Sequence, residues 1–355
     1  MAFRLRLFIS SLNNREVKPM YMFKYVMKRL GLMLLSFSVI MLICFVLIKL
    51  LPIVVTVQAG EDAKIVYAQL EARGYIQNIR YDANGLVIGY DRVPILTQLF
   101  IYLKRIFVYG DFGIGVTMSE YRNQPVWDVF IEKLPPTILI NIYSSLIGVP
   151  IGIGLGIFAA LKKNKWQDQI ISTAVILLIS LPSIVLGLVI QYVFCYKLDW
   201  FPLTMLSGYD YFSWKMFRSM LPAVLSLCLG SIAGYTRFTR AELTEVLTGE
   251  FMLLARTKGL TRGQATFRHA LRNAMVVIFP SILSEFISVL SGSLIIESMF
   301  SIPGVGRLYI MSINAQDYDF FMLLSGFYCL VGLAAGIVVD ISYGFIDPRI
   351  RMGAK

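Results

Sequence analysis

Charged residues are scarce in this sequence of 355 residues, at 15% of positions, whereas soluble domains average roughly 25%. Hydrophobic residues make up 57%. This composition excludes an ordinary soluble fold and indicates a membrane protein. The net charge of +11 is typical of basic loops that flank membrane spans. No basic patch is interleaved with base-stacking aromatics, so we expect no nucleic-acid partner.

Cysteine and histidine are also nearly absent. The cysteines Cys44, Cys195, Cys228 and Cys329 are scattered in apolar runs without a CxxC pair, so we expect buried, unpaired thiols. With His269 as the single histidine, the sequence offers no His-rich metal site and no Ser/His/Asp triad. The ATP-binding pattern GxxxxGK[ST] is missing too. We therefore expect no catalytic residue, metal or cofactor, and a chain that is not an enzyme.

Long apolar runs dominate what is present. The first run is too long for a signal peptide and lacks a small-residue cleavage site, so we predict a retained span. A span needs about 20 mostly apolar residues. Six segments qualify: 31–53, 136–161, 169–195, 220–236, 275–296 and 321–346.

The distribution of basic residues predicts the orientation of these spans. Segments 1–30, 162–168, 237–274 and 347–355 hold 20 of the 33 Lys and Arg residues. The short loops on the other side, 196–219 and 297–320, hold three and one. By the positive-inside rule, both termini and the segment 237–274 lie in the cytoplasm.

The predicted fold is an all-α polytopic membrane protein with six transmembrane helices, cytoplasmic N and C termini and a small extracytoplasmic insert. The predicted parts are a cytoplasmic N-terminal arm (1–30), the first transmembrane helix (31–53), the insert (54–133), a five-helix core (134–346) that includes the cytoplasmic loop 237–274, and a cytoplasmic tail (347–355).

The insert has sequence features of a folded unit. Residues 78–91 predict a β-hairpin, because Asn84-Gly85 suits a type I′ turn between apolar-alternating strands. Residues 94–110 have a helical apolar face. This helix either lies along the outer membrane surface or packs on the spans, and the sequence leaves both open.

A basic stretch at 255–274 interrupts the apolar pattern. Residues 250–258 predict a short helix, in which Phe251, Leu254, Ala255 and Lys258 share one face. Gly259 is placed to end it, and residues 261 and 264 have capping-box spacing for a second helix. Such a charged helix–turn–helix suits either anionic lipid or a cytoplasmic protein.

Glu285 is the single acid in the middle of a predicted span. A charge at that depth is costly, so its side chain must face a cavity or a partner rather than lipid. Ser281 and Ser288 each lie about one turn from it and make that side polar. We consider two roles, lining of a translocation path or an interhelical hydrogen bond. Pro182 with Ser183 is a second candidate for the path, because proline frees a backbone carbonyl; a kink that only serves packing is the alternative.

Four segments, in order, resemble one family. They are the basic stretch "ARTKGL…RHALRNA", the segment 109–140, the segment 292–321 and the ending "DPRIR". Together they resemble permease subunits of ABC importers, in the oligopeptide/dipeptide permease family. The resemblance covers roughly 22–53 and 94–351; the insert 54–93 matches nothing in the family pattern, and of the loop's general "EAA" positions only Ala255 agrees.

The resemblance implies a function and partners. The family's cytoplasmic loop seats in a groove of an ATPase subunit, which implies coupling roles for Phe251, Leu254, Ala255, Arg256, Lys258, Gly259, Leu260 and His269. It also implies an ATP-driven importer of peptides in a prokaryotic plasma membrane, working by alternating access. The implied partners are a second homologous permease, two ATP-binding cassette subunits, an extracytoplasmic peptide-binding protein, peptide substrate and membrane lipid.

Three alternatives remain at this point. Within the family, a permease for nickel or another small solute shares these motifs. An intramembrane enzyme would need a nucleophile–base pair or metal ligands in the spans, and a lone His269 supplies neither. An autonomous channel or scaffold would leave the loop at 255–274 without a purpose.

Overall fold

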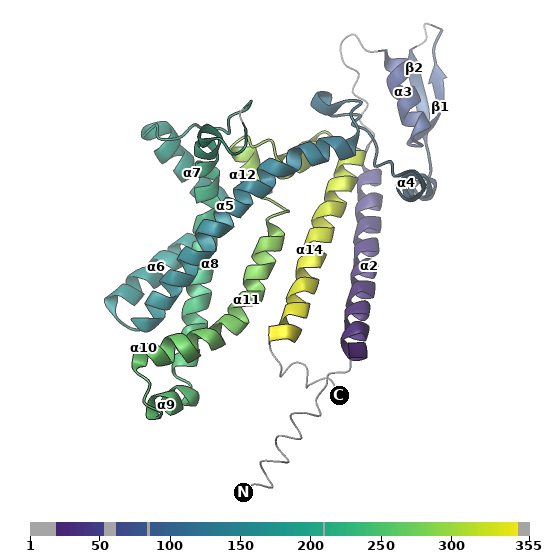
Figure 1. The fold of residues 1–355 in the computed structure, drawn as a ribbon. Coiled ribbons are helices and arrows are strands. Elements are labelled where there is room, and N and C mark those ends of the chain that lie inside the picture. Colours follow the sequence, from purple (N-terminus) through teal and green to yellow (C-terminus); the bar gives the residue numbers. More distant parts are fainter. Residues whose placement is uncertain (1–18, 53–61, 84–85, 209, 347–355) are drawn as a thin grey trace.

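The protein is a fan of long helices with a small α/β unit at one end (Figure 1). The computed structural model describes residues 19–52, 62–83, 86–208 and 210–346. The helices are α2 (Pro19–Leu50), α3 (Ala63–Ala72), α4 (Ile95–Tyr109), α5 (Val126–Leu161), α6 (Trp166–Ser180), α7 (Ser183–Ile190), α8 (Trp214–Leu247), α9 (Glu250–Thr257), α10 (Arg262–Ala265), α11 (Leu271–Ser288), α12 (Leu294–Met299), α13 (Val305–Asn314) and α14 (Tyr318–Ile346). The strands are β1 (Ile76–Tyr81) and β2 (Val87–Arg92), and the short helical turns are η1 (Ser119–Tyr121), η2 (Gln191–Lys197) and η3 (Thr266–Ala270).

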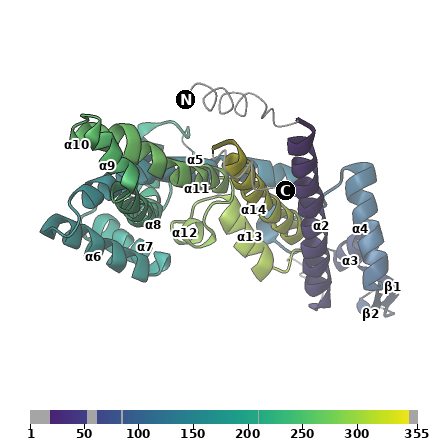
Figure 2. The same cartoon turned by 90° about the horizontal axis from the view of Figure 1, so that it is seen from below.

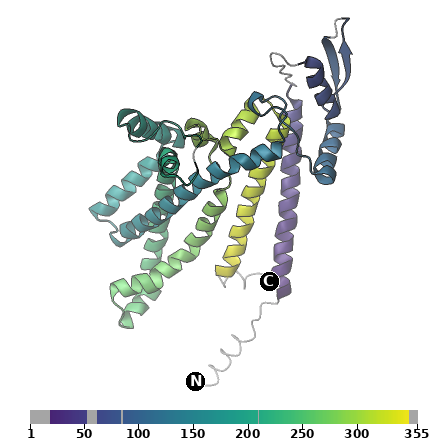
Figure 3. The ribbon, with the colours of Figure 1, turned by 45° about the horizontal axis from the view of Figure 1, so that its top comes forward.

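Among the described residues, five helical segments are long and apolar enough to cross a membrane, within α2, α5, α8, α10–α11 and α14. The predicted count of six holds only if the bent pair α6 and α7–η2 is counted as one span. The first residues of α2, the last residues of α14 and the helices α9 and α10 lie at one end of the fan, whereas α3, β1, β2 and α12 lie at the other (Figures 1 and 3). This arrangement agrees with the orientation predicted from the basic loops.

The predicted span 169–195 is a bent pair of helices rather than one continuous helix. The chain forms α6, breaks at residues 181–182, and continues as α7 and η2 at 103° to α6. Leu181 adopts an extended conformation (φ −86°, ψ 130°), because a residue that precedes proline is disfavoured in the helical region. Pro182 also has no N–H to continue the helical ladder.

The predicted span 275–296 also ends too late. Helix α11 stops at Ser288, and Gly292 takes a left-handed φ of +65°, which a β-carbon would disfavour. Ser293 then caps a new helix, α12, by accepting a hydrogen bond from the Ile296 amide. Apolar composition continues across this turn, so hydropathy alone could not reveal it.

Four other helices differ from the predictions only in their bounds. Helix α2 begins at Pro19, inside the predicted arm 1–30, and ends at Leu50 rather than at residue 53. Helix α5 begins ten residues before the predicted 136, and carries Pro135 and Pro136 inside its first turns. Helix α8 extends the predicted 220–236 to Trp214–Leu247, capped by Ser213, whose hydroxyl accepts from the Met216 amide. Helix α14 begins three residues before the predicted 321.

Helices α5 and α8 pack closely through small residues. A β-carbon on Gly152 would overlap Tyr235 of α8, and one on Gly156 would overlap Thr239. The Thr236 hydroxyl donates to the Gly152 carbonyl at 3.2 Å. Close approach of this kind supplies the dispersion contacts that hold helices together where lipid offers no hydrophobic driving force. Asp168 of α6, which is buried, pairs with Arg240 of α8 and adds the next helix to this core.

The insert is folded, as its sequence predicts. Strands β1 and β2 pair antiparallel, with Ile76 opposite Arg92 and Tyr81 opposite Val87. The predicted turn residues Asn84 and Gly85 lie outside the described residues. Helix α3 contacts this hairpin. Helix α4 follows the hairpin, and its bounds, Ile95–Tyr109, agree with the predicted helix at 94–110 to within one residue at each end.

A buried charge cluster fixes the insert to the outer end of α14. Asp319, 2% exposed, accepts hydrogen bonds from Arg73 at 3.0 Å, from Arg105 at 3.3 Å and from the Tyr75 hydroxyl. The ammonium nitrogen of Lys49, from α2, lies 3.6 Å from the Tyr75 ring centroid. Four segments of the chain therefore meet at one carboxylate, and a charge buried this deeply needs such partners.

The two-sided arrangement predicts a labelling pattern. In a variant whose four cysteines are replaced by serine, single cysteines are placed at Ser207 and Gln264, both of which are exposed. A membrane-impermeant thiol reagent added to intact cells should label position 207 and leave position 264 unlabelled until the membrane is opened. Labelling of position 264 from outside would contradict the orientation.

The charge cluster predicts a difference between two aspartates of the same region. Asp319→Ala leaves the largely buried Arg73 without its partner and leaves Arg105 with Asp111 alone, and should cost about 3–5 kcal/mol of unfolding free energy. Asp91→Ala removes an exposed pair with Arg80 and should cost less than about 1 kcal/mol. Denaturant unfolding of the purified chain in mixed micelles measures both losses. Equal losses would mean that the cluster stabilises the fold no more than an exposed ion pair does.

Candidate functional site

The basic stretch forms the predicted helix–turn–helix at the end of the fan away from the insert (Figure 3). Helix α9 ends before Gly259, which takes a φ of +89°. The Thr261 amide donates to Gln264 Oε1 at 3.1 Å, and the Gln264 amide donates to Thr261 Oγ1 at 3.3 Å. This reciprocal pair is the capping box that the spacing predicts. Helix α10 then runs through η3 directly into α11.

The residues of the predicted coupling face do not all point outward. Ala255 is 7% exposed and packs in the chain's own core with Leu243, Ala265 and Ala270. Leu254 is 57% exposed, and Lys258, Gly259 and His269 are also exposed, whereas Leu260 is half-buried. The side chains of Phe251 and Arg256 lie outside the described residues. The single face predicted from periodicity is therefore divided between the interior and the surface.

Two exposed apolar side chains of this loop were not among the predicted site residues. Leu253 and Phe267 are each 63% exposed, and they come from the two arms of the helix–turn–helix. Large apolar residues that stay exposed at a charged surface are typical of a protein interaction site. The sequence signal for them is weak, because Leu253 lies off the periodic face of α9 and Phe267 lies outside α9, in η3.

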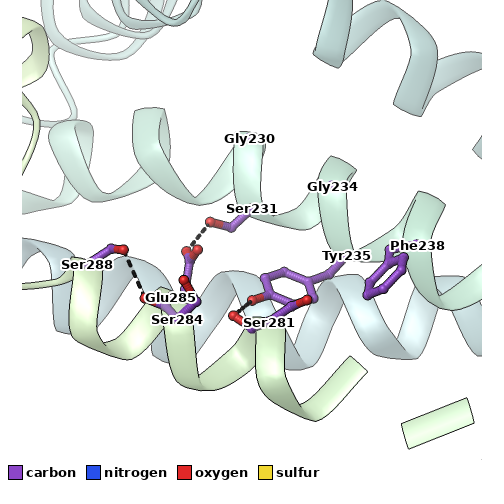
Figure 4. A pocket seen from close by; sticks show the side chains of 9 residues that line it. All are labelled: Gly230, Ser231, Gly234, Tyr235, Phe238, Ser281, Ser284, Glu285 and Ser288. Carbon is purple, nitrogen blue, oxygen red and sulfur yellow. Dashed lines mark hydrogen bonds between the residues drawn. The ribbon is translucent and has the colours of Figure 1, made fainter. Parts of the chain in front are cut away.

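A cavity of about 500 Å³ opens between α8 and α11. Nine residues line it, five from α8 and four from α11: Gly230, Ser231, Gly234, Tyr235, Phe238, Ser281, Ser284, Glu285 and Ser288 (Figure 4). Gly230 and Gly234 leave space on this side of α8, because they have no side chain and no other atom lies within 4 Å of where a β-carbon would stand. Hydroxyls and one carboxylate make this surface polar at the depth of a span.

Glu285 points across the cavity toward α8 (Figure 4). Its Oε1 accepts a hydrogen bond from the Ser231 hydroxyl at 2.7 Å, and the Tyr235 hydroxyl donates to the Ser281 carbonyl at 3.0 Å. The lining includes no Lys or Arg. A carboxylate among hydroxyls, with no lining cation, attracts ammonium groups and N–H donors.

The predicted path residues fall in two places. Glu285, Ser281 and Ser288 all line the cavity. Pro182 and Ser183 lie at the break between α6 and α7, where both are exposed, and they do not belong to the cavity lining. Ser231 and Tyr235 of α8 complete the polar wall, and no pattern in the sequence singles them out.

A further buried carboxylate, after Asp168 and Asp319, lies in α12. Glu297 of α12, 1% exposed, accepts from the Gly306 amide at 2.8 Å and from the Ser293 amide at 3.3 Å. Burial raises the pKa of Glu297 to about 7, and these amide donors oppose that shift. This carboxylate ties α12 to the first turn of α13. A β-carbon at Gly292, Gly304 or Gly306 would overlap the Glu297 carboxylate. These three glycines are therefore the feature of the sequence that could have pointed to this site.

The described residues contain no group of three or more His, Cys, Asp or Glu placed to hold a metal ion. The two regions with distinctive chemistry are therefore the helix–turn–helix, which presents apolar and basic groups, and the polar cavity. The arrangement suits binding and movement of a solute.

Comparison with known proteins identifies the family. The model of the binding-protein-dependent transport system inner membrane component matches residues 152–352. The chain belongs to this family. The dipeptide transport system permease protein DppB of Lactococcus lactis subsp. cremoris is 32% identical over 331 residues, covering 93% of this chain and 100% of the relative. The glutathione transport system permease protein GsiC of Escherichia coli (strain K12) is 31% identical over 330 residues, covering 93% and 99%.

Two solved structures are also similar. An amino acid ABC transporter with histidines aligns with 62% of this chain and 94% of its own, at 20% identity and a TM-score of 0.46. The MetNI methionine ABC transporter, in an inward-facing form, aligns with 61% and 98%, at 15% identity and a TM-score of 0.46.

Family membership confirms the function class predicted from the sequence. The chain is the permease component of an ABC importer, a multi-pass protein of the plasma membrane. Members of the family work with ATPase and substrate-binding proteins. The basic helix–turn–helix and the polar cavity are thus features of a transport subunit.

Proposed function

We propose that this chain is the permease subunit of a peptide importer, and that the cavity between α8 and α11 is its half of the translocation path. The observation that carries the proposal is the polar wall around Glu285, which lies within the spans and has no cationic neighbour in its lining. Peptides carry an amino end and a row of backbone N–H groups, and a carboxylate with hydroxyls binds both. The relatives named for dipeptide and glutathione transport support this substrate class.

A second, homologous permease completes the path. The cavity is a surface groove of about 500 Å³ in this chain, and a lipid-facing carboxylate would be costly. A partner chain facing α8 and α11 removes that cost by enclosing the groove. Glu285 then contacts the substrate's amino end or backbone amides, and Ser281 and Ser288 extend the polar surface along α11.

Two ATP-binding cassette subunits supply the energy through the helix–turn–helix. Leu253, Leu254 and Phe267 are exposed, and we place them in the groove of an ATPase, where Lys258 and His269 meet acids or carbonyls. Ala255 and Leu260 support the loop from inside. Phe251 and Arg256 keep their proposed contact roles, and Gly259 sets the angle between the two arms.

Alternating access follows from this arrangement. Closure of the ATPases moves α9 and α10, and α10 is continuous through η3 with α11. The wall that carries Glu285 therefore moves with the loop and opens the path outward, where an extracytoplasmic binding protein delivers peptide. Hydrolysis returns the inward-facing state. No covalent step occurs in this chain.

The cavity favours peptide over nickel as cargo. Its lining contains a single carboxylate and no imidazole or thiolate. Imidazole and thiolate are the groups that soft and borderline transition metals prefer as ligands. Hydroxyl groups bind nickel weakly but hydrogen-bond well to amides.

Gly259 and Gly263 form a matched pair for testing the coupling role. A β-carbon at either position would meet nothing within 4 Å, but only Gly259 has a positive φ. Gly259→Ala should strain the turn by about 1–2 kcal/mol and lower ATP-driven uptake severalfold while membrane insertion stays normal. Gly263→Ala, in a helix, should leave uptake unchanged. Equal uptake by both variants would contradict a coupling role for this turn.

Peptide uptake in cells that lack this gene and carry a plasmid copy tests the substrate and Glu285 together. The unaltered chain should restore uptake of labelled di- and oligopeptides and not of labelled nickel. Glu285→Gln keeps the shape but removes the charge, and should change the ratio of Lys-containing to Glu-containing peptide uptake by roughly tenfold, equivalent to 1.4 kcal/mol.

Glu132→Gln is the control for charge, because Glu132 is 67% exposed and pairs only with neighbouring Lys133 in the described structure. It should leave the uptake ratio unchanged. A proportional fall for every peptide with Glu285→Gln would make Glu285 a structural residue. Restored nickel uptake would overturn the peptide assignment itself.

A further inference from the structure

Helix α4 has two different apolar faces, and only one of them is covered. On the covered face, Ile95, Leu99 and Tyr102 pack with the core around Phe45 and Ile48 of α2, and the Phe45 and Tyr102 ring centroids are 5.5 Å apart. Arg105 on the same side reaches Asp319. This contact fixes the rotation of α4 about its own axis.

The other face presents large apolar side chains to the outside. Leu96 and Phe100 are each 71% exposed, Leu103 is 39% exposed and Phe107 is 81% exposed. Their spacing of four, three and four residues places them in one narrow stripe along the helix. We call these four residues the α4 stripe. Thr97 and Lys104, both exposed, lie along its edge, and α4 contains no acid.

The position of α4 indicates what covers the stripe. The helix lies beside the outer end of α2, seen end-on in Figure 1 and along its length in Figure 2. At that end, Leu47 and Leu50 of α2 are 59% and 63% exposed, as expected of a span that faces lipid. The apolar surface of α2 therefore continues onto α4.

Exposed aromatic residues begin α8 and end α4. Trp214, the first residue of α8, is 72% exposed, and Tyr109, the last residue of α4, is 67% exposed. Tryptophan and tyrosine collect where the hydrocarbon meets the headgroups. Both residues lie at the end of the fan that carries the insert.

We propose that α4 is an interfacial helix whose stripe is immersed in the outer leaflet of the membrane. Acyl chains cover Leu96, Phe100, Leu103 and Phe107, and Lys104 at the edge of the stripe meets lipid phosphate. Because Arg105 on the opposite face binds Asp319, the helix links the membrane surface to the first turn of α14. The insert, which continues directly into α4, is thereby held at a fixed height above the membrane.

Spin labels on single cysteines test this proposal in the complete transporter, with all its subunits, reconstituted in phosphatidylcholine–phosphatidylglycerol vesicles. The four native cysteines are replaced by serine, and labels are placed at Phe100 and Phe107, with Leu96 as a further stripe position. Collision with oxygen reports lipid, and collision with a water-soluble nickel chelate reports water. Ile88→Cys, 68% exposed on the hairpin, is the water control, and Leu42→Cys, 46% exposed on α2, is the lipid control.

The stripe labels should collide severalfold more with oxygen than with the nickel chelate, giving values between those of the two controls. Values equal to those of the Ile88 control would show that the stripe faces water and would overturn the proposal. Immobile labels that neither reagent reaches would also overturn it, because another protein chain would then cover α4. Only labelled transporters that retain ATP-driven uptake are compared, which excludes misfolded variants.

Discussion

A polar group inside a membrane has no water to bond with, so each backbone break and each charge in this chain must be satisfied by the protein itself. The described structure meets this requirement in the same way several times. Asp168 pairs with Arg240, Asp319 pairs with Arg73 and Arg105, and Glu297 accepts from backbone amides beside the break after α11. Asp168 and Asp319 join segments that are distant in sequence, whereas Glu297 joins the neighbouring helices α12 and α13. The helix fan is held in register at these points, while small residues and dispersion contacts supply the packing between them.

The same requirement connects the outer insert with the transport core. Asp319 lies in the first turn of α14, and α14 packs beside α11, the helix that carries Glu285. A change in the position of the insert therefore acts on a helix that neighbours the cavity wall. At the opposite end, α9 and α10 lie between α8 and α11 in the chain, and these two helices form the cavity. Both ends of the molecule are thus one helix away from the proposed path, which is the arrangement that an ATP-driven importer needs.

Much of the fold was accessible from the sequence because lipid imposes long apolar runs and a charge asymmetry. These features gave five of the spans, the placement of the basic loop at the end away from the insert, the insert itself and the helix–turn–helix, whose capping box and glycine turn have short-range signals. The breaks at Pro182 and Gly292 were missed, because hydropathy is continuous across both. The division of the coupling face was missed for another reason. Periodicity shows that Leu254 and Ala255 share a side of α9, but it does not show that Ala255 contacts the chain's own core.

The sequence by itself determined that this protein crosses the membrane and which family its motifs resemble, since these depend on composition and on local order. It also predicts which side of the membrane the basic loop faces. It also singled out Glu285, because a lone acid in an apolar run is conspicuous. Only the tertiary structure decided what that acid contacts, since Ser231 lies 54 residues away on α8. The meeting of Lys49, Arg73, Arg105 and Asp319 likewise joins positions up to 270 residues apart in the chain. Such pairings depend on how helices pack, and a single sequence carries no local signal for them.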